Sequence, residues 1–217
     1  IDFAGHSTFL ITSPQGIKVA TDYNDFHRAK ELPDIATMSG WHYNHSTSSI
    51  EPSITHALYG WDRGLGPPRH DITMKDLRVY SVPANIGLSG DFFRFPTAVF
   101  VIESNGICIA HLGLVGEVLA QDALSRIGKI AVLLVPVDQR VTLSISETVA
   151  NIKAINPKIV IPMHYNAEMT VEHFLAEVKN VFPVIRPESG TLIASRATLP
   201  SKTEVHFLLP PTFGRGL

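Results

Sequence analysis

The sequence lacks the features that define several common classes of protein. It contains one cysteine, Cys108, so no disulfide can form within the chain. No apolar run approaches the roughly eighteen residues needed to cross a membrane, which argues against a membrane partner. Lysine and arginine form no run and the net charge is -2. The basic face that nucleic-acid phosphates require is therefore absent as well, and we expect a small-molecule partner instead.

What remains is the composition of a soluble globular protein, with 45% hydrophobic and 18% charged residues in 217. A chain of this length can bury a substantial core. With no linker or low-complexity tract visible, we predict one domain over residues 1–217. The chain opens at Ile1 in an apparent strand and without a methionine. We expect a cytoplasmic location, or a periplasmic one if a signal peptide has been removed. A homo-oligomer is compatible with the sequence.

Three predicted strands each lead into histidine. The four histidines are His42 and His45, three residues apart, then His111 and His164. A lone histidine at a strand end is more often a hydrogen-bonded structural residue than a ligand. Three such junctions favour a shared pocket, because binding residues gather in the loops at a sheet edge. Imidazoles held there have the restricted freedom that metal ligands need.

Two further residues are candidates for the same pocket. His6 lies in the short segment between the first two predicted strands, where it could contact substrate or serve as a turn residue. Asp22 ends the third predicted strand. Its carboxylate could stand behind a ligating histidine, accept the N–H of the ring nitrogen that does not bind the metal, and so fix the tautomer. Turn chemistry, in which an aspartate binds its own backbone, accounts for Asp22 equally well.

The order of predicted elements favours an α/β fold. Strands dominate the first half, and the Asn105-Gly106 pair predicts a hairpin. The second half alternates strands with helices at 144–155, which opens with a capping box, and at 171–182, which carries an apolar stripe. Residues 191–195 and 204–209 are predicted to close the fold as strands. Apolar strands flanked by amphipathic helices indicate sheets covered by helices.

Five motifs come in an order that carries a resemblance: GHSTFLI at 5–11, the strand 17–22, SGWHYNH at 39–45, HLG at 111–113 and IPMHY at 161–165. This order resembles the metallo-β-lactamase superfamily, in particular the bacterial metal-dependent hydrolases that include ascorbate-6-phosphate lactonase. The resemblance covers nearly the whole chain. It implies an αββα sandwich with two mixed sheets covered by helices and a metal pocket along one sheet edge.

The resemblance also shows where this chain departs from the family. The family's metal loop, Thr-His-x-His-x-Asp-His, places its first histidine on Gly40 and its aspartate on Asn44. The bridging aspartate of the family falls on Leu114. The ligands that remain are His42, His45, His111 and His164. Two adjacent dications need nearby negative charge, and both carboxylates are missing, so a mononuclear site is predicted.

These residues lead to two hypotheses. The first is a hydrolase of a lactone, ester or phosphoester that uses one metal-activated water, with zinc as the first choice and iron, nickel or manganese as alternatives. The resemblance places the family's proton acceptor at Asn44, and an amide cannot accept a proton. His6 or a histidine that does not bind the metal would then have to act as the general base. The second is a degenerate, non-catalytic binding or scaffold protein that holds no metal.

Overall fold

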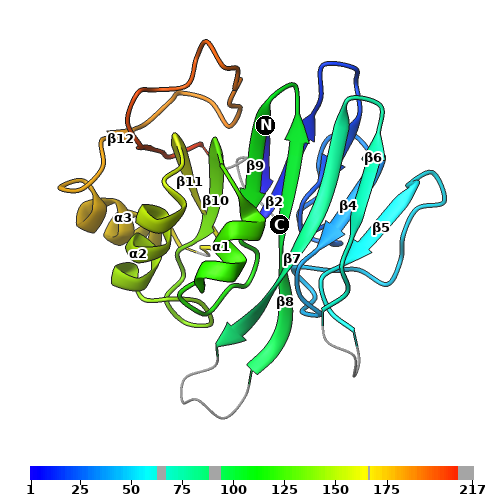
Figure 1. The fold of residues 1–217 in the computed structure, drawn as a ribbon, viewed down its shortest axis with the longest axis horizontal. Helices are drawn as coiled ribbons and strands as arrows, with labels where there is room; N and C mark the ends of the chain where they lie inside the picture. The colour runs from blue at the N-terminus through cyan, green and yellow to red at the C-terminus, as the bar shows by residue number, and fades with distance from the viewer. Residues whose placement is uncertain (63–66, 88–93, 166, 210–217) are drawn as a thin grey trace, which may run out of the picture.

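Two β-sheets face each other in the computed structural model, which describes residues 1–62, 67–87, 94–165 and 167–209 (Figure 1). The first sheet has the order β1-β2-β3-β4-β5. Its strands are β1 (Asp2–Gly5), β2 (Thr8–Thr12), β3 (Lys18–Ala20), β4 (Ile35–Met38) and β5 (His56–Tyr59). The first three pair antiparallel and the last three parallel, so this sheet is mixed.

The second sheet is larger and is also mixed, with the order β12-β13-β11-β10-β9-β8-β7-β6. Its strands are β6 (Asp71–Met74), β7 (Leu77–Gly87), β8 (Arg94–Ser104), β9 (Ile107–His111), β10 (Val132–Pro136), β11 (Ile159–Met163), β12 (Val184–Ile185) and β13 (Glu204–His206). Strands β6 to β9 pair antiparallel, whereas β9, β10 and β11 run parallel. The predicted hairpin at Asn105-Gly106 joins β8 to β9, with both residues at positive φ.

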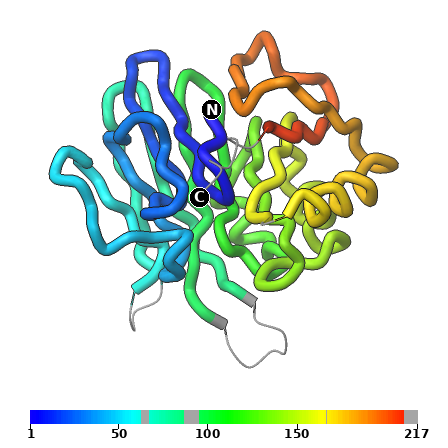
Figure 2. The backbone as a smooth tube through the Cα atoms, turned by 180° about the vertical axis from the view of Figure 1, so that it is seen from behind, coloured from blue at the N-terminus to red at the C-terminus, as the bar shows by residue number. Residues whose placement is uncertain are grey.

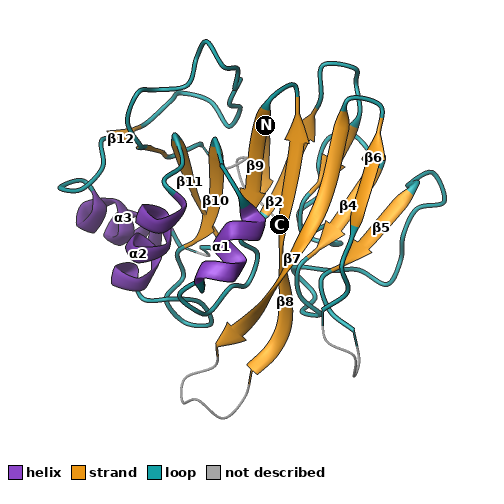
Figure 3. Ribbon diagram, viewed as in Figure 1, coloured by secondary structure: helices purple, strands orange, loops and turns teal. Residues whose placement is uncertain are grey.

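Three helices accompany the second sheet: α1 (Gln121–Ile127), α2 (Ile145–Ile155) and α3 (Glu168–Val178). Figure 3 shows them together on the side of β10 and β11, and none of the described helices lies beside β4 or β5. None of them combines the length and the apolar character that crossing a membrane requires. The predicted two-sheet α/β sandwich is confirmed, and within the described ranges its helices come only from the second half of the chain.

The core lies between the two sheets. Phe9 and Ile35 from the first sheet belong to the same buried cluster as Phe100 and Leu133 from the second. The apolar face of α3 joins this cluster through Phe174, which is fully buried. Each such side chain contributes roughly 1.5–3 kcal/mol by leaving water. The sheets are thus held in one arrangement, which fixes the edge where their loops meet.

The predicted strand at residues 191–195 is wrong. Only Thr191 forms a bridge, with Asp2, and Ile193 is 82% exposed. Ser195 begins a turn instead, with its backbone N–H donating to Thr198 Oγ1. The segment still contacts the start of the chain, since Leu192 N donates to the carbonyl of Ile1 at 2.8 Å (Figure 2).

The capping box at the start of α2 gives a modest stability prediction. The Ser144 side chain accepts from the backbone N–H of Glu147, and the Glu147 side chain accepts from the backbone N–H of Ser144. Ser144→Ala leaves the N–H of Glu147 to water, so we expect a loss of about 1 kcal/mol in urea unfolding. Ser53→Ala, at an exposed serine outside α2, is the control and should change stability by less than about 0.5 kcal/mol.

Candidate metal centre

The parallel strands of the second sheet deliver polar residues to one edge. His111 is the last residue of β9, and His164 follows β11 directly. Between these strands lies β10, and Asp138 comes two residues after its end. The carboxyl ends of neighbouring parallel strands meet at the same sheet edge, where ligand sites of such sheets form. These three side chains are therefore brought to one place by the topology.

The first sheet contributes two histidines to the same edge. His6 occupies the tight turn between β1 and β2 with a φ of 53°, and His45 lies in the loop that follows β4. The backbone N–H of His164, itself at a φ of 59°, donates to the carbonyl of His6 at 2.8 Å. This bond fastens the turn of one sheet to the strand end of the other.

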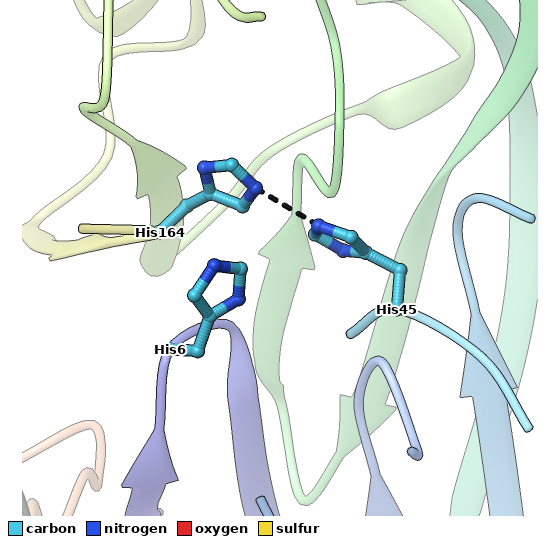
Figure 4. Close-up of side chains that lie close together, drawn as sticks. All are labelled: His6, His45 and His164. Carbon is cyan, nitrogen blue, oxygen red and sulfur yellow. Dashed lines mark hydrogen bonds between the residues drawn. The ribbon is translucent and has the colours of Figure 1, made fainter. Parts of the chain in front are cut away.

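Three imidazoles meet at this junction (Figure 4). One ring nitrogen from each of His6, His45 and His164 lies within 4.8 Å of the others, and all three residues are buried. Nε2 of His164 lies 2.9 Å from Nε2 of His45. The ring centroids of His6 and His164 are 4.3 Å apart. Within the described residues this is the group of ligand-type side chains dense enough to hold a metal ion.

Asp22 fixes the orientation of His45. The carboxylate is fully buried and accepts the Nδ1–H of His45 at 2.5 Å and the backbone N–H of Ser39 at 2.9 Å. Burial alone would raise the pKa of Asp22, but these interactions and the neighbouring imidazoles outweigh burial and hold it below its usual range. With its proton on Nδ1, His45 presents the lone pair of Nε2 to the cluster. This carboxylate–histidine pairing is common behind metal ligands.

Asp138 lies behind His164 without a hydrogen bond to its Nδ1, and sequence reasoning missed it. Its Oδ1 lies 3.5 Å from Nδ1 of His164. Burial opposes ionisation, but His164, Thr142 and the backbone N–H of Val141 favour it and lower the pKa of Asp138 to about 2. The available signal was an aspartate just after a buried strand that runs parallel to the strands ending in His111 and His164.

The other predicted residues lie around the cluster. His42 is exposed, and its Nδ1–H donates to Oδ1 of Asn44. Asn44 Nδ2 donates to Nε2 of His6 at 3.1 Å, so this amide connects His42 to the cluster. His111 is fully buried, its Nε2–H donates to the carbonyl of Ser7 at 2.9 Å, and its Nδ1 has no partner among the described residues. The structure thus groups His45 and His164 with His6, and places His42 and His111 outside that group.

Burial favours the neutral form of three imidazoles at this edge, those of His6, His45 and His111. It lowers the pKa of His6 to about 2, with further lowering by His164, His45 and His27. Burial also lowers the pKa of His45 and of His111. Neutral imidazole is the form that binds a metal ion.

Gly40 and Leu114 occupy the place where the resemblance expects two further ligands. A Cβ on Gly40 would lie 2.5 Å from Cδ1 of Leu114, so the leucine side chain fills the space that a side chain at position 40 would need. Leu114 is 5% exposed. An apolar side chain thus occupies this space beside His45.

Comparisons with known proteins give the family. A family model described as "Beta-lactamase superfamily domain" matches residues 1–164. A "UPF0173 metal-dependent hydrolase" of Methanoregula boonei is 31% identical over 186 residues, covering 76% of this chain and 82% of that protein. The chain therefore belongs to the β-lactamase superfamily and, within it, to the family of UPF0173 metal-dependent hydrolases. With four other relatives of that name, the matching stretch spans only 30–48% of their length.

Solved structures agree with the superfamily resemblance predicted from the motif order. A putative zinc-dependent hydrolase of the metallo-beta-lactamase superfamily from Thermotoga maritima has a TM-score of 0.71 and 26% identity, covering 96% of this chain and 97% of that one. A putative metal-dependent hydrolase from Parabacteroides distasonis has a TM-score of 0.69, covering 96% of this chain and 92% of that one. Its 16% identity supports the fold alone. The predicted superfamily and fold are confirmed.

The buried carboxylate of Asp22 gives a second stability prediction. Asn tolerates the positive φ of 42° at this position, so Asp22→Asn tests the charge and the acceptors with little backbone strain. The amide NH2 of the new asparagine must then face the N–H of Ser39 or of His45, which places two donors together. We expect the free energy of unfolding in urea to fall by about 2 kcal/mol. Asp34→Asn is the matched control: the Asp34 side chain accepts the backbone N–H of Lys18, and an amide oxygen can replace that acceptor.

Proposed function

We propose that this protein is a hydrolase whose single divalent ion is held by His6, His45 and His164. The observation that carries the proposal is the convergence of three buried ring nitrogens within 4.8 Å of one another. Asp22 lies behind the ring of His45, and Asp138 lies behind the ring of His164. The proposed substrate is a small molecule with a lactone, ester or phosphoester bond. Zinc is the first candidate for the ion, because a three-nitrogen site with one open position is typical of catalytic zinc.

An ion requires the three nitrogens, which now lie within 4.8 Å of one another, to come closer together. Zinc–nitrogen bonds of about 2.0–2.1 Å place tetrahedral nitrogens about 3.3 Å apart. The two Nε2 atoms of His45 and His164, now 2.9 Å apart, would instead separate slightly. Nε2 of His6 would exchange the amide of Asn44 for the ion, while Nδ1–H keeps its contact with Ser7 Oγ at 3.2 Å.

Each residue then has a defined task. The ion, when bound, supplies a water that ionises near neutral pH and polarises the substrate oxygen. Asp22 and Asp138 orient His45 and His164. Asn44 can donate a hydrogen bond to substrate, but its amide cannot accept a proton. The exposed His42 beside Asn44 can accept the proton instead and pass it to solvent. His111 supports the turn at Ser7 through its bond to that carbonyl.

Metal content and turnover, measured together, test the proposal. The purified protein is analysed by plasma mass spectrometry before and after dialysis against a chelator, and again after adding back zinc, iron, nickel or manganese. We expect one ion per chain and hydrolysis of an ester, lactone or phosphoester panel that disappears and returns with the ion. One ion without any turnover overturns the hydrolase. No ion under any of these conditions overturns the metal site.

A non-catalytic binding protein is the second candidate. The specific observation in its favour is that the site is closed by its own bonds: His164 donates to His45 and Asn44 donates to His6. The apolar contact of Leu114 with Gly40 points the same way. For this alternative we expect no ion, no turnover and equal thermal stability with and without chelator.

Asp138 provides a graded test of the same site. Asp138→Asn keeps an oxygen near His164 and removes the charge that favours a metal-bound imidazole, so we expect the metal dissociation constant to rise about 10–100-fold. The affinity is measured by competition with a chromogenic chelator. Asp122→Asn, at an exposed acidic residue in the first turn of α1, is the control and should leave the affinity unchanged.

A further inference from the structure

The histidine cluster forms part of the wall of a cavity of about 590 Å³. This volume is within the range of small-molecule sites. The rest of the wall is largely apolar and comes from separate parts of the chain: Trp41, Ile86, Phe95, Leu114 and Val141. The cavity therefore offers an apolar surface immediately beside three imidazoles, and a substrate must match both.

Leu114 forms the part of this surface beside the loop that carries His45. A Cβ at position 40 would lie 2.5 Å from Cδ1 of Leu114 and 4.0 Å from Cβ of His45. The glycine therefore permits the leucine to lie against the loop that carries His45. Polar substrate atoms placed there would lose their water without gaining a partner, whereas an apolar group gains by burial.

The charges of the cavity wall are asymmetric. Apart from histidines, its charged side chains are Asp138 and Arg140. The Asp138 carboxylate is already engaged by the side chain of Thr142, by the N–H of Val141 at 3.2 Å and by His164. Arg140 is exposed and forms neither an ion pair nor a side-chain hydrogen bond with any residue that the structure describes. A guanidinium free on a cavity wall suits a carboxylate or phosphate, which it can bind through two N–H groups.

We propose that this cavity takes an amphipathic anion: an ester or lactone with an apolar or aromatic group on Leu114 and a single anionic group on Arg140. The substrate class rests on the proposed function, whereas the binding preference does not. Hydrolysis of a lactone keeps both features in one product and adds a carboxylate. Hydrolysis of an ester gives an acid and an alcohol, and each keeps whichever of the two groups it carried. Specificity thus resides in Leu114 and Arg140, outside the three proposed ligands.

Binding of product-like probes tests the inference without requiring turnover. The probes are 4-phenylbutyrate, its neutral amide 4-phenylbutanamide, and phenyl phosphate, followed by Trp fluorescence because Trp41 lines the cavity. We measure them with the protein as purified and after chelation, so that direct binding of an anion to a metal is separated from binding to Arg140. In the chelated protein we expect the carboxylate to bind about tenfold or more tightly than the amide. Tighter binding of phenyl phosphate than of 4-phenylbutyrate identifies phosphate as the preferred anion.

Variants assign each preference to its residue. Arg140→Ala should reduce the carboxylate-to-amide ratio to near one, whereas Arg126→Ala, at an exposed arginine of α1 paired with Asp122, should not. Leu114→Ala should weaken all three phenyl probes about tenfold through lost apolar contact. Metal affinity should stay unchanged in both variants.

The two failures are distinguishable. If the metal-loaded protein shows no turnover but keeps these binding preferences, the hydrolase proposal is overturned and the amphipathic site remains. If binding shows no preference for an anion, or does not depend on Leu114 and Arg140, this inference is overturned. The same holds for turnover, and neither result bears against the hydrolase proposal.

Discussion

We expect His6→Ala to weaken metal binding by more than about a hundredfold, while His42→Ala changes it by less than about threefold. His6 is buried in the cluster with His45 and His164, whereas His42 is exposed and bonded to Asn44. Loss of a direct ligand should cost more than the roughly 10–100-fold that loss of a residue supporting a ligand costs. The dissociation constant is measured by competition with a chelator of known affinity, and the bound metal is counted by mass spectrometry.

This pair of variants separates two assignments of the same centre. Motif order alone places His42 among the ligands and leaves His6 for contact with substrate. If His42→Ala abolishes binding and His6→Ala does not, the loop after β4 must rearrange around the ion and our ligand set is wrong. His173→Ala, at a histidine on α3 outside the cluster, controls for nonspecific loss of metal-binding side chains.

The largest effect on stability should come from acid. In the metal-free protein, burial lowers the pKa of His6, His45 and His111. In the unfolded chain these groups titrate near about 6.5, so the unfolded state binds more protons below that pH. The free energy of unfolding therefore falls as the pH falls, by up to about 1.4 kcal/mol per pH unit for each imidazole that stays neutral in the folded state. His6, whose pKa is lowered to about 2, alone gives a loss of roughly 2 kcal/mol between about pH 7 and pH 5, and His45 and His111 add to it.

Urea unfolding of the chelated protein at several pH values measures this slope. His6→Gln removes one of the three imidazoles, so its slope below about pH 6 should be smaller by about 1.4 kcal/mol per pH unit. His56→Gln, in the partly exposed strand β5, is the matched control and should keep the slope of the parent protein. A stability that stays flat down to about pH 4.5 would show that these imidazoles are protonated in the folded state.

The strand ends that carry His45, His111 and His164 could be predicted from the sequence, because an apolar run that stops at a histidine marks the point where a buried strand leaves its sheet. The separation of His42 from His45 could not. The two are three residues apart, and the turn between them, closed by the N–H of His45 on the carbonyl of His42, buries one and exposes the other. That outcome depends on packing against Asp22 and His164, which lie far away in the chain.

The sequence predicts strands at 77–82 and 98–103, shorter than β7 and β8, for a local reason. Pro83 and Pro96 interrupt the pattern expected of strands, yet they lie inside β7 and β8, which pair along their whole lengths of 11 residues. Proline in a strand argues against a central position, so the sequence favoured shorter strands. The consequence matters for the site, since the extension carries Ile86 and Phe95 to the cavity.

The position of the histidine cluster between the two sheets has a consequence for the rate of unfolding. His45 and His164 lie 119 residues apart in the chain and are contributed by opposite sheets. An ion held by both, and by His6, would close a very long loop, and closing such a loop carries a large entropic cost for the unfolded chain. The centre would then form late in folding, after the sheets have docked. The two sheets could separate only after the ion had left, so the ion's dissociation rate would limit how fast the loaded protein unfolds.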